Sequence, residues 1–155
     1  MSLFSRKPSL PDAIPDGPWS MVQGAQDGQL MLARVHMGVD SLAGHPAYGF
    51  RVGIATKMQA LANNGMPTPE ENTTLQALEE RIRNAVEVDR EAFLVIAITC
   101  GGVKEWVFYT SNPESTKRRM QAFAPSVQTH KLQMIIEPDD KWTVYRDFAH
   151  PRAKN

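Results

Sequence analysis

Two apolar runs in the middle of the chain, at 92–100 and 103–109, carry the clearest pattern of hydrophobic positions. Both are rich in β-branched and aromatic residues, and Gly101 and Gly102 between them form a preferred two-residue hairpin turn. The pattern therefore predicts a central β-hairpin in which Leu94 lies opposite Tyr109. Since side chains alternate between the faces of a strand and both faces are mostly apolar here, each face needs cover.

Helices of the chain are the expected cover for one face of this hairpin. Two interpretations are open for the other face: either the N-terminal strands fold over it, or a second subunit packs on it and makes the protein a homodimer. An apolar sheet face that its own chain leaves uncovered is normally an interface. This face is therefore the first indication of a function in binding.

The chain before the central hairpin begins with turns and strands. Four prolines among residues 1–18 predict a flexible lead-in. Strands are expected at 19–26 and 29–36, on either side of the turn residues Asp27 and Gly28. A further strand is expected at 48–55, where large apolar residues alternate with small or charged ones.

Two helices are expected, one on either side of the central hairpin in the sequence. Thr68, with Glu71 three residues later, forms a capping box that begins the first helix. Asn112 is the expected N-cap of the second helix. On the surface of the first helix, Glu79 and Arg83 are expected to form an i,i+4 ion pair.

From Tyr48 onward the expected order is strand, helix, strand, strand, helix, strand, with the last strand at 130–136. This is the order of the ferredoxin-like split β-α-β arrangement, an α+β fold with an antiparallel sheet and two helices, to which the N-terminal β-hairpin is an addition. A chain of 155 residues suits one domain, which we place at 19–149 and follow with a C-terminal tail at 150–155. Fold alone indicates no activity.

Charge and composition narrow the classes of function. Seventeen basic and seventeen acidic residues give a formal net charge of zero, which argues against nucleic acid or an anionic membrane as the partner. No segment resembles a signal peptide or approaches the roughly 20 apolar residues of a membrane span. The lone Cys100 leaves no intramolecular disulfide, which suits a reducing compartment. We therefore expect a cytoplasmic protein.

Residues suited to catalysis or metal binding are few. Cys100 could act as a nucleophile beside the backbone N–H groups of Gly101 and Gly102, but no histidine is near it in sequence, so a buried structural thiol is the favoured interpretation. The acidic residues between Glu137 and Asp147 fit no calcium-loop pattern, and the histidine spacing supports no zinc site. We therefore predict no metal and no cofactor.

Aromatic residues provide the more distinctive candidate site. Trp106 and Tyr109 lie on the central hairpin, and three further aromatic residues follow the last strand at intervals of three: Trp142, Tyr145 and Phe148. These rings either form a binding platform or seal the end of the core, and the second interpretation is favoured.

Glu105 is the candidate residue for the alternative function, an enzyme of small-molecule chemistry or a ligand-binding domain. It lies in a partly apolar hairpin, where burial would raise its pKa and suit it to acid or base catalysis. A deep cleft that holds Glu105 with a histidine or arginine would favour this alternative. A flat apolar face would favour a protein partner.

Three segments resemble the bacterial domain of unknown function 695 family: Gly65-Met66-Pro67 before the first helix, ITCGGVKEWVFYT in the central hairpin, and the ending EPDDKWTVYRDF. Members of that family carry a Gly-x-x-Glu-Trp-x-x-Tyr hairpin and a Trp-x-x-Tyr-x-x-Phe ending. The corresponding residues here are Gly102, Glu105, Trp106 and Tyr109, then Trp142, Tyr145 and Phe148. The resemblance spans about residues 19–148 and implies the fold, with no established activity.

Some relatives of that family are joined to a domain similar to the ribonuclease E inhibitor protein B, so the resemblance implies, by association, a regulatory and protein-binding role. Together these observations predict a small non-catalytic module that binds a protein partner. The candidate binding residues are Glu105, Trp106, Tyr109, Trp142, Tyr145 and Phe148.

Overall fold

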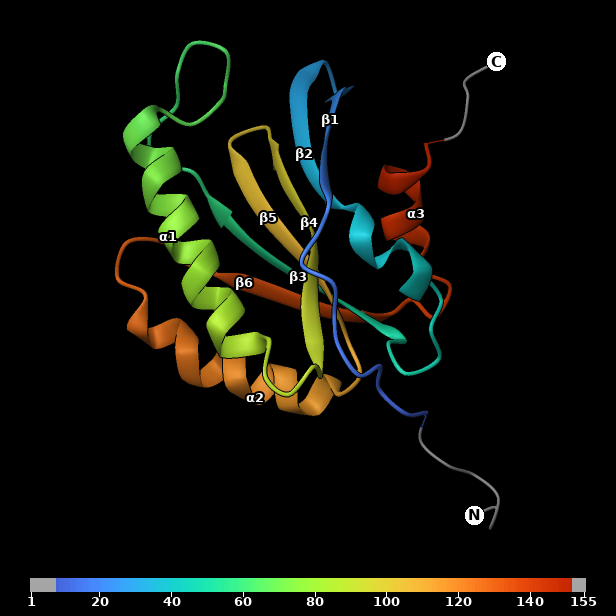
Figure 1. The fold of residues 1–155 in the computed structure, drawn as a ribbon. Helices are drawn as coiled ribbons and strands as arrows, with labels where there is room; N and C mark the ends of the chain where they lie inside the picture. Colours follow the sequence, from blue (N-terminus) through green and yellow to red (C-terminus); the bar gives the residue numbers. More distant parts are fainter. Residues whose placement is uncertain (1–7, 152–155) are drawn as a thin grey trace.

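The computed structural model describes residues 8–151, and one antiparallel sheet runs through it (Figure 1). Residues 1–7 of the predicted lead-in and 152–155 of the predicted tail lie outside this range. Six strands form the sheet in the order β1-β2-β4-β5-β3-β6. They are β1 (Trp19–Gln26), β2 (Gln29–His36), β3 (Phe50–Lys57), β4 (Ala92–Cys100), β5 (Val103–Thr110) and β6 (Gln133–Pro138). The helices are α1 (Pro69–Val86), α2 (Pro113–Phe123) and α3 (Thr143–Ala149), with the 3-10 helices η1 (Met37–Leu42) and η2 (Ala124–Ser126).

The central hairpin supplies β4 and β5, which lie third and fourth in the sheet, and its register holds one irregularity. From the turn to Ile96 the two strands pair as predicted. Beyond Ile96 the register shifts, so that Leu94 lies opposite Phe108. The prediction that Leu94 lies opposite Tyr109 is wrong, because a β-bulge at Val95 adds one residue to β4.

The bulge decides which side chains of β4 face each side of the sheet. Val95 and Ile96 follow one another in the chain, yet both belong to the core cluster on the same face. Leu94 and Ala97, on either side of them, belong to the cluster on the other face. The sheet therefore has two cores, one on each face.

The helices α1 and α2 cover the face that holds Leu94 (Figure 1). Both begin where the sequence predicts. Thr68 Oγ1 accepts a hydrogen bond from the Glu71 backbone N–H at 3.2 Å, and Asn112 Oδ1 accepts one from the Ser115 N–H at 3.1 Å. An apolar stripe of α1 is buried against the sheet and consists of Leu75, Leu78, Ile82 and Val86.

The opposite face is covered by α3 and η1, neither of which the sequence pattern predicted (Figure 1). The N-terminal hairpin does not fold over this face, because β2 pairs with β4 and extends the sheet sideways. The prediction of two helices is therefore wrong. The third helix, α3, has only seven residues, and Trp142, the N-cap residue before it, has a left-handed φ of 57°. A helix this short gives little sign of itself in the spacing of the aromatic residues. The face that suggested a second subunit thus carries a helix of its own chain.

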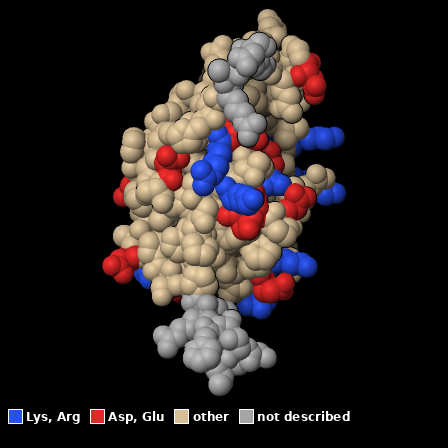
Figure 2. All heavy atoms as spheres, turned by 90° about the vertical axis from the view of Figure 1, so that its right-hand side faces the viewer, with Lys and Arg blue, Asp and Glu red and all other residues tan. Residues whose placement is uncertain are grey.

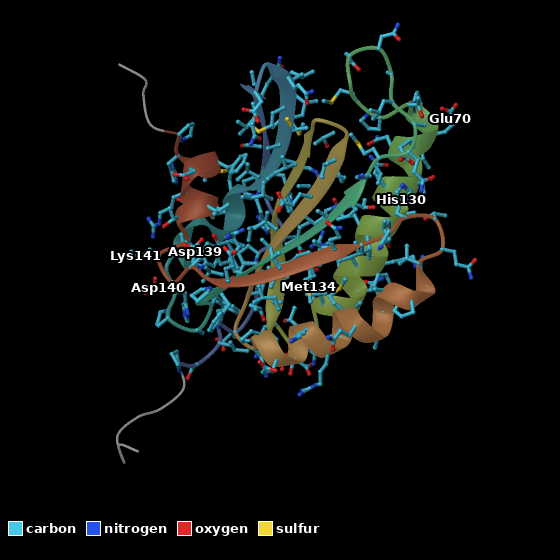
Figure 3. All side chains as sticks on the ribbon, turned by 180° about the vertical axis from the view of Figure 1, so that it is seen from behind. Glu70, His130, Met134, Asp139, Asp140 and Lys141 are labelled. Atoms are coloured by element: carbon cyan, nitrogen blue, oxygen red, sulfur yellow. The ribbon has the colours of Figure 1, made fainter. Side chains whose placement is uncertain are left out.

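The last strand begins at Gln133, three residues later than predicted. His130 is buried, and its Nε2 lies 3.1 Å from Glu71 Oε2 at the start of α1. Figure 3 shows His130 beside α1, at the start of the segment that leads to β6, and Met134 within that strand. The segment at His130 therefore packs on α1 before the chain joins the sheet.

The part of the lead-in that the structure describes has neither helix nor strand, as its prolines predict. It is nevertheless tied to the domain. The Nε of Arg90 donates to the Pro11 carbonyl oxygen at 2.8 Å, and the Nε2 of buried His36 lies 2.8 Å from the Pro15 carbonyl oxygen. We refer to residues 10–18 as the strap.

Candidate functional site: the cleft between α1 and the sheet

The aromatic residues that the sequence offered as a binding platform lie inside the protein. The side chains of Trp106, Tyr109, Trp142 and Tyr145 are all 0% exposed, and Phe148 is half-buried against the same core. Trp142 stacks on Tyr109 with 4.0 Å between ring centroids, and meets Tyr145 edge-on at 5.3 Å. Trp106 fills the core on the α1 side of the sheet, and the other three buried rings fill the core on the α3 side. None of the four offers a surface to a ligand.

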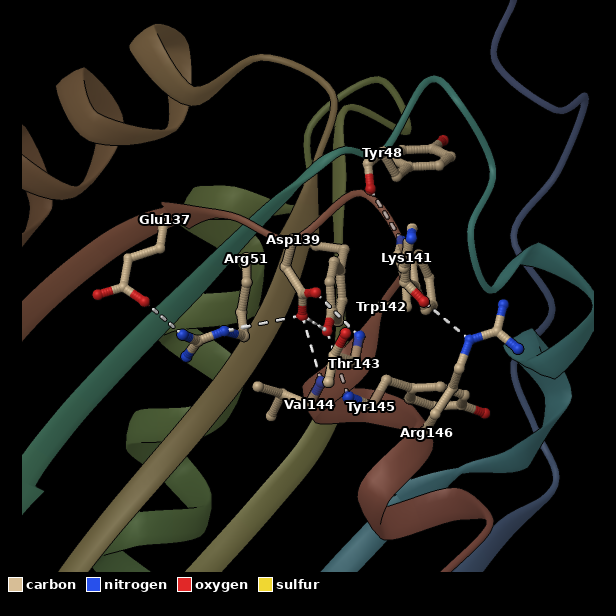
Figure 4. Close-up of polar contacts among 11 residues, drawn as sticks. Tyr48, Arg51, Glu137, Asp139, Lys141, Trp142, Thr143, Val144, Tyr145 and Arg146 are labelled. Atoms are coloured by element: carbon tan, nitrogen blue, oxygen red, sulfur yellow. Dashed lines mark hydrogen bonds and ion pairs between the residues drawn. The ribbon is translucent and has the colours of Figure 1, made fainter.

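The polar atoms of these rings fix α3 to the sheet (Figure 4). The Tyr109 hydroxyl donates to Asp139 Oδ2 at 2.7 Å, and Asp139 Oδ1 accepts the Thr143 backbone N–H at 2.9 Å. Trp142 Nε1 donates to the Tyr48 carbonyl oxygen at 2.8 Å. The Trp-x-x-Tyr-x-x-Phe ending, which forms α3 and its N-cap, therefore packs on the sheet and closes the core on that face.

Glu105 lies on the face of the sheet opposite α1 and is half-buried. It packs against Gly53, where an added Cβ would come within 2.9 Å of Glu105 Oε2. Burial raises the pKa of Glu105, and the charge of Arg51 opposes that shift. Arg51 itself pairs with Glu137 at 2.6 Å. The residue thus has the raised pKa that the sequence suggested, but it does not line the large cleft described next.

The large cleft lies between α1 and the part of the sheet formed by β2, β4 and the start of β5. It has a volume of about 1170 Å³ and runs along α1 from Pro69 to Glu87. Its floor comes from alternate residues of neighbouring strands. Leu32, Thr99 and Lys104 form one row across β2, β4 and β5. Arg34, Ala97 and Trp106 form the next row, in which Trp106 is buried beneath the floor.

Glu79 of α1 joins the helix wall to this floor. Its Oε1 lies 2.5 Å from Arg34 Nη2 and accepts the indole N–H of Trp106 at 3.0 Å. The Arg34 guanidinium also lies over the Trp19 ring, 5.1 Å from its centroid. The predicted ion pair of Glu79 with Arg83 is therefore wrong: Glu79 turns towards the sheet.

Lys104 lies in the cleft floor and is half-buried beside the buried Thr99. Its Nζ donates to Thr99 Oγ1 at 3.0 Å, and it forms no ion pair with any described residue. Burial lowers the pKa of the Lys104 ammonium group; the carboxylate of Glu79 raises it and the charge of Arg34 lowers it further. A cation in this position favours a ligand with an anionic group.

The rim of the cleft has both charged and apolar residues. Arg83 pairs with Glu87 at 3.0 Å along α1, so these two charges neutralise each other. Met21 of β1 is 67% exposed at the far side, and Met66 lies at the end near the start of α1. The cleft therefore combines a floor of mixed character, with Leu32 beside Thr99 and Lys104, with two ion pairs. Among the described residues, Lys104 in the floor and Glu80 at the rim form no ion pair.

Sequence reasoning did not find this cleft. Leu32 and Arg34 meet Thr99 and Ala97 only through the pairing of β2 with β4, which joins residues more than sixty positions apart in the chain. One local signal was available, because Thr99 and Lys104 face each other as a polar pair in an otherwise apolar hairpin.

Outside the cleft, the surface offers little that suggests chemistry. On the side that carries α3, basic and acidic side chains are interspersed around the middle of the face (Figure 2). Among residues 8–151, no three His, Cys, Asp or Glu side chains are grouped as a metal ion would require. Within the same residues, no helix has the length and apolar composition for a bilayer crossing.

Comparison with known proteins gives one result. No curated protein and no solved structure matches the chain significantly. A family described as a family of unknown function, DUF695, matches residues 17–149, which include the central hairpin and the aromatic ending. The match confirms the resemblance drawn from those segments. The chain therefore belongs to the DUF695 family of unknown function.

Proposed function

We propose that this protein is a non-catalytic binding module that holds an α-helix of a partner protein in the cleft beside α1. The observation that carries the proposal is the uncovered part of the sheet next to that helix. Among the described residues, α1 and α2 lie over one face of the sheet, but no helix covers β1 and β2 on that face (Figure 1). The vacant strip has the position of a third helix in the same layer.

The dimensions of the cleft support a helix as the occupant. Packed helices lie about 8–10 Å apart, so a helix beside α1 would rest on β2 and the edge of β4. The cleft follows α1 for its 18 residues, a length of about 27 Å. Its volume of about 1170 Å³ exceeds the roughly 300–1000 Å³ of most small-molecule pockets.

The side chains in the cleft also suit a helix with one apolar face. Leu32 provides apolar surface at the floor, and Met21 and Met66 lie at the margins. Methionine side chains adapt their shape and are common at surfaces that bind amphipathic helices. Glu105, the acid or base of the enzyme alternative, lies on the other face and takes no part in this cleft.

Three finer expectations belong to the same proposal. We infer that β3 to β6 with α1 and α2 form a ferredoxin-like unit, which is supported by the sheet order β4-β5-β3-β6 and by the strand and helix order along the chain. We also propose that the protein is located in the cytoplasm. A regulatory role is the third expectation, and it suits a small binding module.

The experiment is a selection of amphipathic helical peptides of about 18 residues against the purified protein. Selected peptides should bind wild type and lose about tenfold or more in affinity for Leu32→Glu, because the substitution removes an apolar side chain from the floor and places a carboxylate in the row of Thr99 and Lys104. Ile135→Glu is the matched control, since Ile135 is an exposed apolar residue of β6 outside the cleft. Peptides that bind Leu32→Glu as well as wild type would contradict the proposal.

A further inference from the structure

Lys104 differs from the other cations of the cleft in having no carboxylate partner. Arg34 is paired with Glu79, and Arg83 is paired with Glu87. Lys104 forms no ion pair with the residues that the structure describes, although it lies in the floor one row from Arg34. Lys104 is therefore a floor cation without an ion pair among the described residues, while the exposed Glu80 at the rim is the lining carboxylate without one.

The atoms around Lys104 are arranged to receive an anion. An ammonium group has three N–H donors, and one of them is used on Thr99 Oγ1 at 3.0 Å. The Thr99 hydroxyl keeps its own hydrogen as a donor. Since Thr99 and Lys104 lie opposite each other on β4 and β5, their free donors are available on the same row of the sheet. A carboxylate is a suitable acceptor for two such donors.

The surroundings limit which anion fits. Leu32 lies next to Thr99 in the same row, and Leu75 faces the row from α1. The remaining charges near Lys104 are those of Glu79 and Arg34, which satisfy each other. A single carboxylate beside an apolar side chain fits this row, as an Asp or Glu on the apolar side of a helix would provide.

We propose that Lys104 and Thr99 form an anchor for the carboxylate of one acidic residue on the docked helix. This inference rests on the proposed function and adds to it the chemistry that selects the partner. Burial of Lys104 disfavours its charged form in the free protein, and a bound carboxylate would favour that form. A carboxylate bound at this position would therefore stabilise the charged form of Lys104.

The first test uses the selected peptides. With every cleft-facing position varied, an acidic residue should be enriched at one position. Lys104→Met should weaken those peptides about tenfold, while Lys104→Arg should retain much of the binding. Lys117→Met, an exposed lysine of α2, should leave affinity unchanged. Peptides that need Leu32 but show no acidic enrichment and no response to Lys104→Met would overturn the anchor and leave the proposed function standing.

The second test needs no peptide. Propionate, a carboxylate with a short apolar tail, is titrated into protein with labelled lysine and threonine side chains, with chloride of equal ionic strength as the control. Saturable NMR shifts at Lys104 and Thr99, larger than those at Lys117, are expected. Shifts at Lys104 no larger than those at Lys117 would overturn the anchor, whether or not the cleft binds helices.

Discussion

The Tyr109 hydroxyl donates a hydrogen bond to Asp139 Oδ2 at 2.7 Å, and this contact joins the middle of the sheet to the start of α3. The same hydroxyl oxygen accepts the Tyr145 backbone N–H at 3.2 Å. Asp139 in turn caps α3 by accepting the backbone N–H of Thr143. Figure 4 shows Asp139 between Arg51 and the first turn of α3. One tyrosine of the central hairpin thus holds in place the helix that covers the second core.

Tyr109→Phe should lower the free energy of unfolding by about 1–3 kcal/mol, because it removes a donor to a partly buried carboxylate and an acceptor for a buried N–H. Urea unfolding monitored by circular dichroism measures the change. Tyr48→Phe is the control, since the Tyr48 hydroxyl donates to the uncharged Arg90 carbonyl oxygen and should cost about 1 kcal/mol. Equal losses for the two variants would contradict the role given to Asp139.

The Asp139 carboxyl group should also make stability depend on pH. Burial alone raises its pKa, but hydrogen bonds from Tyr109, Thr143 and Val144 outweigh that effect and hold the pKa below its ordinary value. The unfolded chain then binds the proton more readily, so the contribution to stability is present above about pH 4 and is lost as the pH falls through the folded-state pKa. The free energy of unfolding should therefore fall more steeply below about pH 4 in wild type than in Asp139→Asn. Parallel curves would contradict this prediction.

Buried His36 should make stability depend on pH in a higher range than Asp139 does. Burial lowers its pKa, although the hydrogen bond with the Pro15 carbonyl oxygen opposes the shift. As the pH falls below about 6.5, the unfolded chain takes up this proton first, so stability decreases in that range. NMR titration of the His36 ring should give a midpoint below 6.5, the ordinary value. A midpoint at or above that value would show that the strap does not keep the ring buried in solution.

Glu79→Ala should destabilise the protein by about 1–3 kcal/mol, because the buried Trp106 indole N–H and the Arg34 guanidinium lose their shared acceptor. Glu79→Gln keeps an acceptor oxygen and should cost less. Thermal unfolding monitored by circular dichroism measures the effect. Glu80→Ala, an exposed neighbour on α1, should change stability by no more than about 0.5 kcal/mol. An effect of Glu79→Ala as small as that would mean that Glu79 does not join α1 to the sheet.

The features that sequence reasoning predicted are those encoded by neighbouring residues. The capping positions Thr68 and Asn112 begin their helices because a side-chain oxygen reaches an N–H three residues later. The glycine pair at 101–102 adopts positive φ in the central turn for an equally local reason. Such signals need no knowledge of the rest of the fold.

The features that were missed depend on distant parts of the chain. The helix α3 forms where Asp139 and Tyr109 supply its cap and its floor, and Tyr109 lies thirty residues before Asp139. The cleft exists because β2 pairs with β4 in the sheet and does not fold over a face of β4. By contrast, the burial of Trp142 and Tyr145 agrees with the favoured interpretation that these rings seal the core, and only the helix α3 that carries Tyr145 was not indicated.

The extra residue at Val95 changes which residues of β4, odd-numbered or even-numbered, face α1. On the turn side, odd-numbered residues such as Ala97 point towards α1, whereas beyond Val95 the even-numbered Leu94 does so. If all nine residues of β4 alternated strictly, without the bulge, every residue before Ile96 would lie on the other face, and Phe93 would be turned away from the core under α3. Deleting Val95 would instead remove only the extra residue, and Leu94 and Phe93 would keep their present faces.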